Sequence, residues 1–267
     1  MGSGARSGRI EALMFASRVL GRRCNVLMHL PARWGRGARI LYLLHGMYGS
    51  EVDWVYKGAI GQTVDRLRLA GRIGPMIVAM PNDGLAGDGT FYVNWQDGTG
   101  RFEDYMVMEV VREVERGLGV VVNRSRRAIA GLSMGGFGAL ALALRHPGLF
   151  CAAGSLSGAF DALHRPGLSA LGRRMFGRIG GDFWRQHDPA WLVANRRASR
   201  RVALHINCGR ADGLIEANHR LHQRLEALGL EHEYREFPGG HDWGYWRRRV
   251  VPVLEFVWRQ LEAGARR

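Results

Sequence analysis

Two short segments of this chain, Ile40–Leu44 and Pro75–Met80, are apolar at every position. A strand with this pattern is buried on both faces, which is typical of the inner strands of a parallel sheet covered by helices. From Ile40 to the C-terminus, strand-like segments alternate with segments of helical periodicity. This alternation predicts an α/β fold with a mostly parallel sheet and helices on both of its faces.

Turn signals and hydrophobic period set the expected boundaries. The expected strands are Ile10–Val19, Cys24–Leu30, Ile40–Leu44, Pro75–Met80, one ending near Gly131, Leu149–Ser155, Val202–Cys208 and Glu233–Phe237. The expected helices are Asp53–Ala70, Glu103–Leu118 (with a core stripe of Tyr105, Val107, Met108, Val111 and Val114), Met134–Arg145, Leu214–Leu228 and Trp243–Leu261. No linker or repeat divides the chain, so we expect one domain over residues 1–267, in which the less regular segment 158–199 is an insertion that could form a cap.

The charge of the chain is unusual: 38 Lys and Arg face 24 Asp and Glu, a net charge of +14, and Lys57 is the only lysine. Such a balance suggests nucleic acid or an anionic membrane as a partner. The arginines, however, occur in pairs and triplets between acidic residues, without a helix-turn-helix or zinc-finger pattern. We therefore expect a solvated basic surface, with nucleic acid not the main partner. If the clusters 173–178 and 247–249 face the substrate, they would favour anionic esters.

Three cysteines without a short spacing predict neither a disulfide framework nor a zinc site. No apolar stretch approaches 18 residues, so no membrane span is expected. The first eight residues lack the layout of a signal peptide, which makes the cytoplasm the default location, although Met1–Gly4 could replace a native leader. The sequence leaves the oligomeric state open, a homodimer included.

The segment Gly131–Gly135 has the pattern G-x-S-x-G and stands where a predicted strand ends and a helix begins. In that context the pattern makes a sharp turn that projects Ser133 above the sheet, and its glycines avoid clashes with the neighbouring elements. The segment Gly136–Ala141 also fits the dinucleotide pattern G-x-G-x-x-A. Its glycines lie inside the predicted helix, where close helix packing explains them better than a bound cofactor. We expect no cofactor and no metal.

A nucleophilic serine needs a histidine base, and in hydrolases of this topology the chain order is serine, acid, histidine. His241 follows the last predicted strand, where an imidazole can reach the edge of the sheet. His219 and His222 are spaced as a metal pair on a helix, but no third ligand is evident.

Asp212 is the only carboxylate of the loop after the penultimate strand, which makes it the expected acid. Glu216, four residues later, is the alternative. Asp242 is too near His241 in the sequence to orient it comfortably.

An oxyanion hole takes one backbone N–H from the residue after the nucleophile, here Met134, and a second from a loop after an early strand. The loop His45–Gly49 directly follows Ile40–Leu44, and Met47 is the expected second donor.

These motifs, with His45-Gly46-Met47, Gly131–Gly136, Cys208–Asp212 and Gly240-His241 in this order, resemble those of the putative esterase family of α/β-hydrolases. That family includes tributyrin-type esterases, S-formylglutathione hydrolase, feruloyl and acetylxylan esterases, and the antigen 85 mycolyltransferases. The segment Phe91–Trp95 is also similar to the region before the nucleophile in several members.

The resemblance implies an α/β-hydrolase fold and the same roles as the residue patterns: Ser133 as nucleophile, His241 as base, Asp212 as acid, and the amides of Met47 and Met134 as oxyanion donors. Because the mycolyltransferases use glutamate as the acid, the resemblance also keeps Glu216 open.

The expected activity is that of a serine carboxylesterase acting on short-chain or aryl esters through an acyl-enzyme, with a small-molecule ester as partner. An acyltransferase and a catalytically idle basic binding protein are the alternatives. Tyr48, Trp95, Trp243 and Trp246 are expected to line the substrate pocket, although core packing explains the tryptophans equally well.

Overall fold

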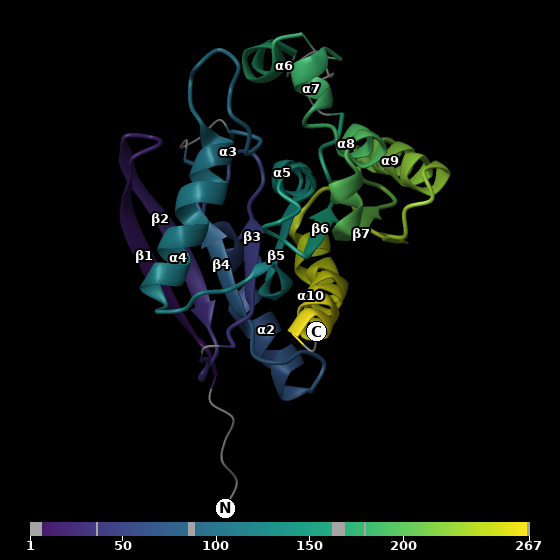
Figure 1. The fold of residues 1–267 in the computed structure, drawn as a ribbon. Helices are drawn as coiled ribbons and strands as arrows, with labels where there is room; N and C mark the ends of the chain where they lie inside the picture. The colour runs from purple at the N-terminus through teal and green to yellow at the C-terminus, as the bar shows by residue number, and fades with distance from the viewer. Residues whose placement is uncertain (1–6, 36, 85–88, 162–168, 179, 266–267) are drawn as a thin grey trace, which may run out of the picture.

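The computed structural model describes residues 7–35, 37–84, 89–161, 169–178 and 180–265 and contains an eight-stranded sheet (Figure 1). The strands are β1 (Arg9–Ser17), β2 (Arg22–Leu30), β3 (Ile40–Leu44), β4 (Ile77–Pro81), β5 (Arg127–Leu132), β6 (Ala152–Leu156), β7 (Ala203–Gly209) and β8 (Glu233–Phe237). Their order across the sheet is β1-β2-β4-β3-β5-β6-β7-β8. The pairs β1·β2 and β2·β4 are antiparallel, and the other five pairs of neighbouring strands are parallel. The predicted mostly parallel sheet is confirmed.

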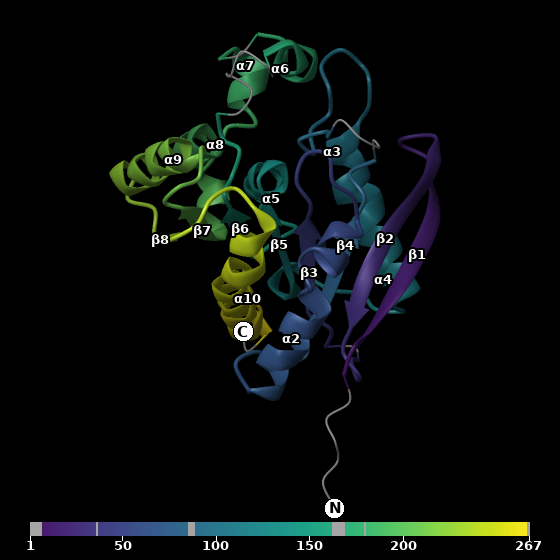
Figure 2. The ribbon, with the colours of Figure 1, turned by 180° about the vertical axis from the view of Figure 1, so that it is seen from behind.

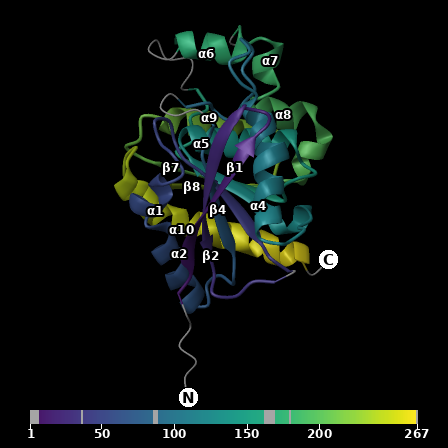
Figure 3. The ribbon, with the colours of Figure 1, turned by 90° about the vertical axis from the view of Figure 1, so that its left-hand side faces the viewer.

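Helices cover both faces of this sheet, as Figure 3 shows from the side. The α-helices are α1 (Asp53–Tyr56), α2 (Ile60–Leu69), α3 (Phe102–Asp104), α4 (Val111–Gly117), α5 (Met134–Arg145), α6 (Ser169–Phe176), α7 (Asp182–Arg185), α8 (Pro189–Asn195), α9 (Ile215–Ala227) and α10 (Trp243–Ala265). A π-helical segment spans Tyr105–Val110, and 3₁₀ turns span Arg124–Arg126 and Arg197–Arg201.

The buried side chains of β3 divide between the two hydrophobic cores. Ile40, Tyr42 and Leu44 point into the core that also holds residues of α4, α5, α8 and α9. Leu41 and Leu43 point into the core beneath α2 and α10, the face turned toward the viewer in Figure 2. Because successive side chains of a strand alternate between faces, a strand covered on both sides must be apolar throughout, as β3 is.

Two expected helices differ from the structure. The helix predicted over 53–70 is broken into α1 and α2, because Ala59 adopts a left-handed backbone conformation with φ 50°. In the helix predicted over 103–118, Tyr105, Val111 and Val114 are buried, but Met108 is 57% exposed. The π-helical turn at Tyr105–Val110 adds a residue to the turn, so the 3.6-residue period no longer marks the buried face.

The segment expected to be an insertion, 158–199, contains α6, α7 and α8, apart from 162–168 and 179, which lie outside the described residues. Helix α8 packs against α5 and α9, whereas α6 and α7 stand beyond the carboxyl end of the sheet (Figure 1).

The carboxylate of Glu103 joins the insertion to the body of the molecule. The residue is 2% exposed, and its carboxylate oxygens lie 2.7 Å from Nε of Arg145, 2.6 Å from Nε2 of His146 and 3.2 Å from Nε2 of His187. Burial alone would raise the pKa of Glu103, but the hydrogen bonds from the two histidines and the charge of Arg145 hold it well below its ordinary value. The carboxylate is thus the stable form in the folded chain.

We expect Glu103→Gln to lower the free energy of unfolding by about 3 kcal/mol at neutral pH, because it removes the acceptor of a buried charged cluster. Since the pKa of Glu103 is lower in the folded than in the unfolded chain, its contribution is complete above the unfolded value of about 4.3 and is lost as the pH falls below it. Urea unfolding of both proteins between neutral and acidic pH measures this difference, which should shrink on acidification.

Asp104→Asn is the matched control, because Asp104 is the neighbouring residue and pairs with the exposed Arg101. An equal loss of stability in both variants, or a loss in Glu103→Gln that does not depend on pH, would contradict the assigned role of the Glu103 carboxylate.

Candidate active site

Ser133 occupies a strained turn between β5 and α5. Its backbone has φ 53° and ψ −118°, an unfavourable conformation for a residue with a side chain. The turn requires glycine on both sides: a Cβ at Gly131 would lie 2.4 Å from the carbonyl oxygen of Gly135, and one at Gly135 would lie 2.5 Å from that of His45. The G-x-S-x-G pattern therefore has the steric role expected from the sequence.

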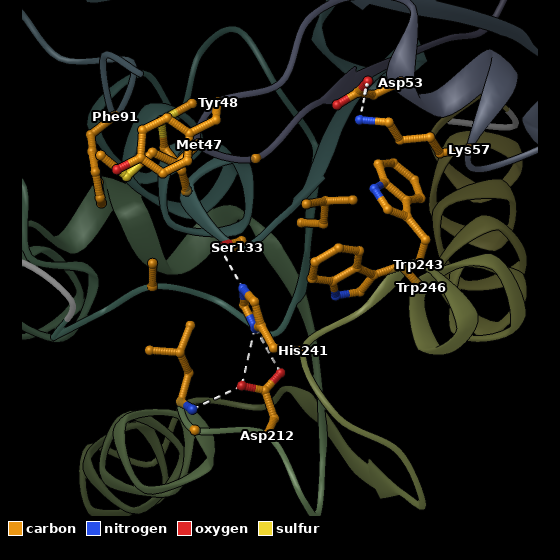
Figure 4. A pocket seen from close by; sticks show the side chains of 16 residues that line it. Met47, Tyr48, Asp53, Lys57, Phe91, Ser133, Asp212, His241, Trp243 and Trp246 are labelled. Atoms are coloured by element: carbon orange, nitrogen blue, oxygen red, sulfur yellow. Dashed lines mark hydrogen bonds and ion pairs between the residues drawn. The ribbon is translucent and has the colours of Figure 1, made fainter. Parts of the chain in front are cut away.

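The structure brings Ser133, His241 and Asp212 into one hydrogen-bonded line (Figure 4). Oγ of Ser133 lies 3.0 Å from Nε2 of His241, and Nδ1 of His241 lies 2.9 and 3.1 Å from the two carboxylate oxygens of Asp212. The three residues follow β5, β8 and β7, respectively. Parallel strands end at the same edge of a sheet, so residues more than 100 positions apart meet there.

Asp212 is buried and held by several donors. The backbone N–H of Leu214 donates to Oδ1 at 2.8 Å, and the hydroxyl of Ser157 donates to the same carboxylate. Burial raises the pKa of Asp212, but the hydrogen bonds from His241, Ser157 and Leu214 outweigh it and lower the pKa below its ordinary value. Asp212 thus remains a carboxylate beside the imidazole.

The two alternative acids lie elsewhere. The side chain of Glu216 is 75% exposed on α9, and its nearest ionic partner is His219 at 3.9 Å. Asp242 accepts a hydrogen bond from the backbone N–H of Tyr245 at the start of α10. Of the three carboxylates weighed from the sequence, Asp212 is the one in contact with His241.

Ser157 belongs to this network but was missed by the sequence analysis. It is fully buried directly after β6, with φ 50°. Its Oγ accepts a hydrogen bond from Nε1 of Trp246 at 3.2 Å, and the ring of Trp246 packs nearly perpendicular to that of His241, with centroids 4.9 Å apart. The one signal for Ser157 in the sequence was that a polar residue follows a predicted strand, at the same edge of the sheet as Ser133.

A cavity of about 510 Å³ opens over Ser133 and His241 (Figure 4). It is lined by Gly46, Met47, Tyr48, Asp53, Lys57, Phe91, Leu132, Ser133, Met134, Ala159, Asp212, Gly213, Leu214, His241, Trp243 and Trp246. Tyr48, Trp243 and Trp246, three of the residues expected in a substrate pocket, are in this lining. Of the described part of 158–199, Ala159 alone is in this lining. No arginine of the described chain is in it either, so neither 173–178 nor 247–249 contributes a lining residue.

Trp95 does not line the cavity, which corrects the expectation for that residue. Its ring is buried against Phe102, with Nε1 donating to the carbonyl oxygen of Thr90 at 3.1 Å and the guanidinium of Arg174 over its face. The spacing of residues in the sequence could not show which way the Trp95 ring points. For Trp95, core packing was the correct one of the two interpretations.

The loop after β3 brings Met47 to the same cavity as Met134. The carbonyl oxygens at its base are held by buried side chains: Nε1 of Trp54 donates to that of Leu44 at 2.9 Å, and the hydroxyl of Tyr92 donates to that of His45 at 3.0 Å. The loop that carries the proposed second oxyanion donor is therefore fixed by the core before any substrate binds.

The paired histidines of α9 are engaged with neighbours in β8 and the loop before it. His219 contacts Glu236, and Nδ1 of His222 lies 2.8 Å from Nε2 of His232. Among the described residues no group of three side chains is arranged to bind a metal ion, and all three cysteines are buried free thiols. No helix in the described part of the chain combines the length and apolarity needed to cross a membrane.

Comparison with known proteins agrees with this geometry. Residues 17–257 match the family model described as "Putative esterase". An acetyl esterase of Caldicellulosiruptor saccharolyticus is 25% identical over 270 aligned residues, which cover 93% of this chain and 97% of that protein. The diacylglycerol acyltransferase/mycolyltransferase Ag85A of Mycobacterium ulcerans is 26% identical over 285 aligned residues, which cover 89% of this chain and 77% of that protein.

A solved ferulic acid esterase has the same fold, with a TM-score of 0.83 and 28% identity over 95% of this chain and 99% of that one. The fold is that of the α/β-hydrolases, as the resemblance implied. Because the family model spans nearly the whole chain and the Ser133 turn stands at the edge of that sheet, the chain belongs to the "Putative esterase" family and is a serine esterase.

Proposed function

We propose that this chain is a carboxylesterase that hydrolyses short-chain or aryl esters through an acyl-enzyme on Ser133. The observation that carries the proposal is the line of contacts from Ser133 through His241 to Asp212 at the floor of an open cavity. The acetyl esterase and ferulic acid esterase names of two similar proteins support a carboxylic ester as the substrate.

In the first step, Nε2 of His241 accepts the proton of the Ser133 hydroxyl as Oγ attacks the ester carbonyl. The carbonyl oxygen becomes an oxyanion, which the backbone N–H groups of Met47 and Met134 stabilise. Asp212 keeps the proton on Nδ1 of His241 and stabilises the imidazolium that forms. The lowered pKa of Asp212 fits this role, because the acid must remain negatively charged throughout.

The tetrahedral intermediate then collapses. The C–O bond to the alcohol breaks, and His241 returns its proton to the departing oxygen, which leaves an ester between the acyl group and Ser133. In the second half, His241 takes a proton from a water molecule that attacks this ester. The second tetrahedral intermediate releases the carboxylic acid and restores the Ser133 hydroxyl.

Acyl transfer to an alcohol or sugar is the second candidate, supported by the name of the similar Ag85A protein. The two activities share every step up to the acyl-enzyme and differ in whether water or an alcohol attacks it. The side chain of His241 is 36% exposed, so water reaches the base without a conformational change. That exposure favours hydrolysis.

We expect Ser133→Ala to reduce kcat for 4-nitrophenyl acetate by a factor on the order of 10⁶, because no other group can form the acyl-enzyme. The measurement is a continuous absorbance assay, with circular dichroism to show that the variant is folded. A fluorophosphonate probe should label the wild type and not the variant. Unlabelled wild type would favour the idle binding protein instead.

Asp212→Asn should lower kcat by a factor on the order of 10⁴, since the amide cannot hold His241 in the tautomer that accepts the serine proton. Glu216→Gln is the matched control, because it removes a carboxylate four residues away that has no contact with His241. Steady-state kinetics of both variants decide between the two acids. The reverse ranking would make Glu216 the acid.

Free acid should remain the main product when an alcohol or a sugar is added to the reaction, because water has open access to His241. Chromatography of the products from 4-nitrophenyl butyrate with and without glycerol measures the partition. If the new ester became the main product at acceptor concentrations far below that of water, the enzyme would be an acyltransferase.

A further inference from the structure

Lys57 is the only lysine in a chain with 38 basic Lys and Arg residues, and it lines the cavity over Ser133. Among the described lining residues it is the one lysine or arginine. Figure 4 shows Lys57 and Asp53 on the same side of the cavity as Trp243 and Trp246, across from Met47 and Tyr48.

The position of Lys57 in this wall is fixed by its backbone. Its N–H donates to the carbonyl oxygen of Asp53 at 2.9 Å, and its own carbonyl oxygen accepts two hydrogen bonds from the guanidinium of Arg247, at 2.8 and 3.2 Å. The next residue, Gly58, lies against Trp54 and Trp243, which pack edge to face. The side chain of Lys57 therefore extends from a backbone segment that hydrogen bonds and packing hold in place.

The ammonium group is oriented by Asp53 but remains accessible. Nζ lies 3.0 Å from Oδ1 of Asp53, and the Lys57 side chain is 54% exposed against 11% for Asp53. An ammonium has three N–H donors, so two remain for a ligand after the bond to Asp53. Because the Asp53 side chain is the more buried of the two, the ammonium is the more accessible group of this ion pair.

The lining holds the carboxylates of Asp53 and Asp212 as well as Lys57, and it is the positive charge beyond the lining that favours an anionic ligand over a neutral one. The guanidinium of Arg247 lies beside the Lys57 backbone, and the chain as a whole carries a net charge of +14. A field of this sign raises the local concentration of anions. The apolar rings of Trp243 and Trp246 lie on the same side of the cavity as Lys57 (Figure 4), and Leu132 also lines the cavity.

We propose that this cavity accepts esters that carry a carboxylate, with Nζ of Lys57 binding the carboxylate and Asp53 orienting the ammonium. The inference rests on the proposed esterase function and names its substrate class. The substrate combines a reactive ester at Ser133, an apolar middle section along Trp243 and Trp246, and an anionic end at Lys57. Lys57 is a specificity residue in this proposal and takes no part in the bond-making steps.

The test uses two pairs of esters that differ in one charge. The first pair places the charge on the alcohol side: 4-acetoxybenzoate and its methyl ester. The second places it on the acyl side: the mono-4-nitrophenyl ester of adipic acid and 4-nitrophenyl hexanoate. The readout is the ratio of kcat/KM for the anionic ester to that for its neutral partner, measured at low and high salt.

In the wild type we expect this ratio to favour the anion in at least one pair and to fall with added salt, because salt screens the exposed ammonium. Lys57→Met should lower the ratio roughly tenfold, mainly through KM, in keeping with the loss of one charged hydrogen bond. Lys57→Arg should keep most of the preference for the anionic ester. The control Arg72→Met removes a cation of similar exposure that is paired with Glu255, and its ratio should equal that of the wild type.

The variant Asp53→Asn separates a carboxylate ligand from a hydroxyl ligand. For a carboxylate, loss of the competing negative charge keeps or raises the ratio, whereas a hydroxyl held by both groups would lose binding in Asp53→Asn and Lys57→Met alike. If Lys57→Met leaves Asp53 unpaired and the protein unstable, the double variant Asp53→Asn/Lys57→Met removes both charges and should show the same low ratio.

The outcomes separate this inference from the proposed function. If neither member of either pair is hydrolysed in a Ser133-dependent way, the esterase proposal fails. If both members are hydrolysed with the same efficiency in the wild type and in Lys57→Met, the esterase proposal stands and the carboxylate site is wrong.

Discussion

The site depends on one steric constraint: the close approach of β3, β5 and α5 around the strained backbone of Ser133. Because Gly131 and Gly135 carry no Cβ, the start of α5 comes within contact distance of the carbonyl oxygens at the end of β3. The same approach places the loop that carries Met47 and the first residue of α5, Met134, on one cavity. Larger residues at these glycines would move Ser133 and both proposed oxyanion donors together.

Three acidic side chains illustrate how burial and partners decide the role of a charge. Glu103 and Asp212 are both buried, and donors around each hold its pKa down, but the first contacts His187 of the segment 158–199 and the second contacts His241. Asp53 is paired with Lys57 at the cavity wall. Of the many basic residues of the chain, Lys57 is thus the one that the structure places in the described cavity lining, as part of an ion pair.

The sequence predicted the inner strands β3 and β4 best, because a strand between two layers of helices is apolar on both faces. It failed where local geometry broke the period: the left-handed Ala59 divided a predicted helix, and the π-helical turn at Tyr105–Val110 turned Met108 toward solvent. Neither conformation has a distinct signal in residue type, because both arise from packing against the rest of the fold.

The order of Ser133, Asp212 and His241 along the chain, each directly after a strand, was determined by the sequence alone, since parallel strands bring their carboxyl ends to one edge. Only the tertiary structure decided which neighbours join them. It buried Trp95 while it brought Trp246 and Ser157 against His241 and Asp212, and it placed the single lysine in the cavity wall. The physical reason is that side-chain direction depends on contacts between segments distant in the sequence, which no local pattern encodes.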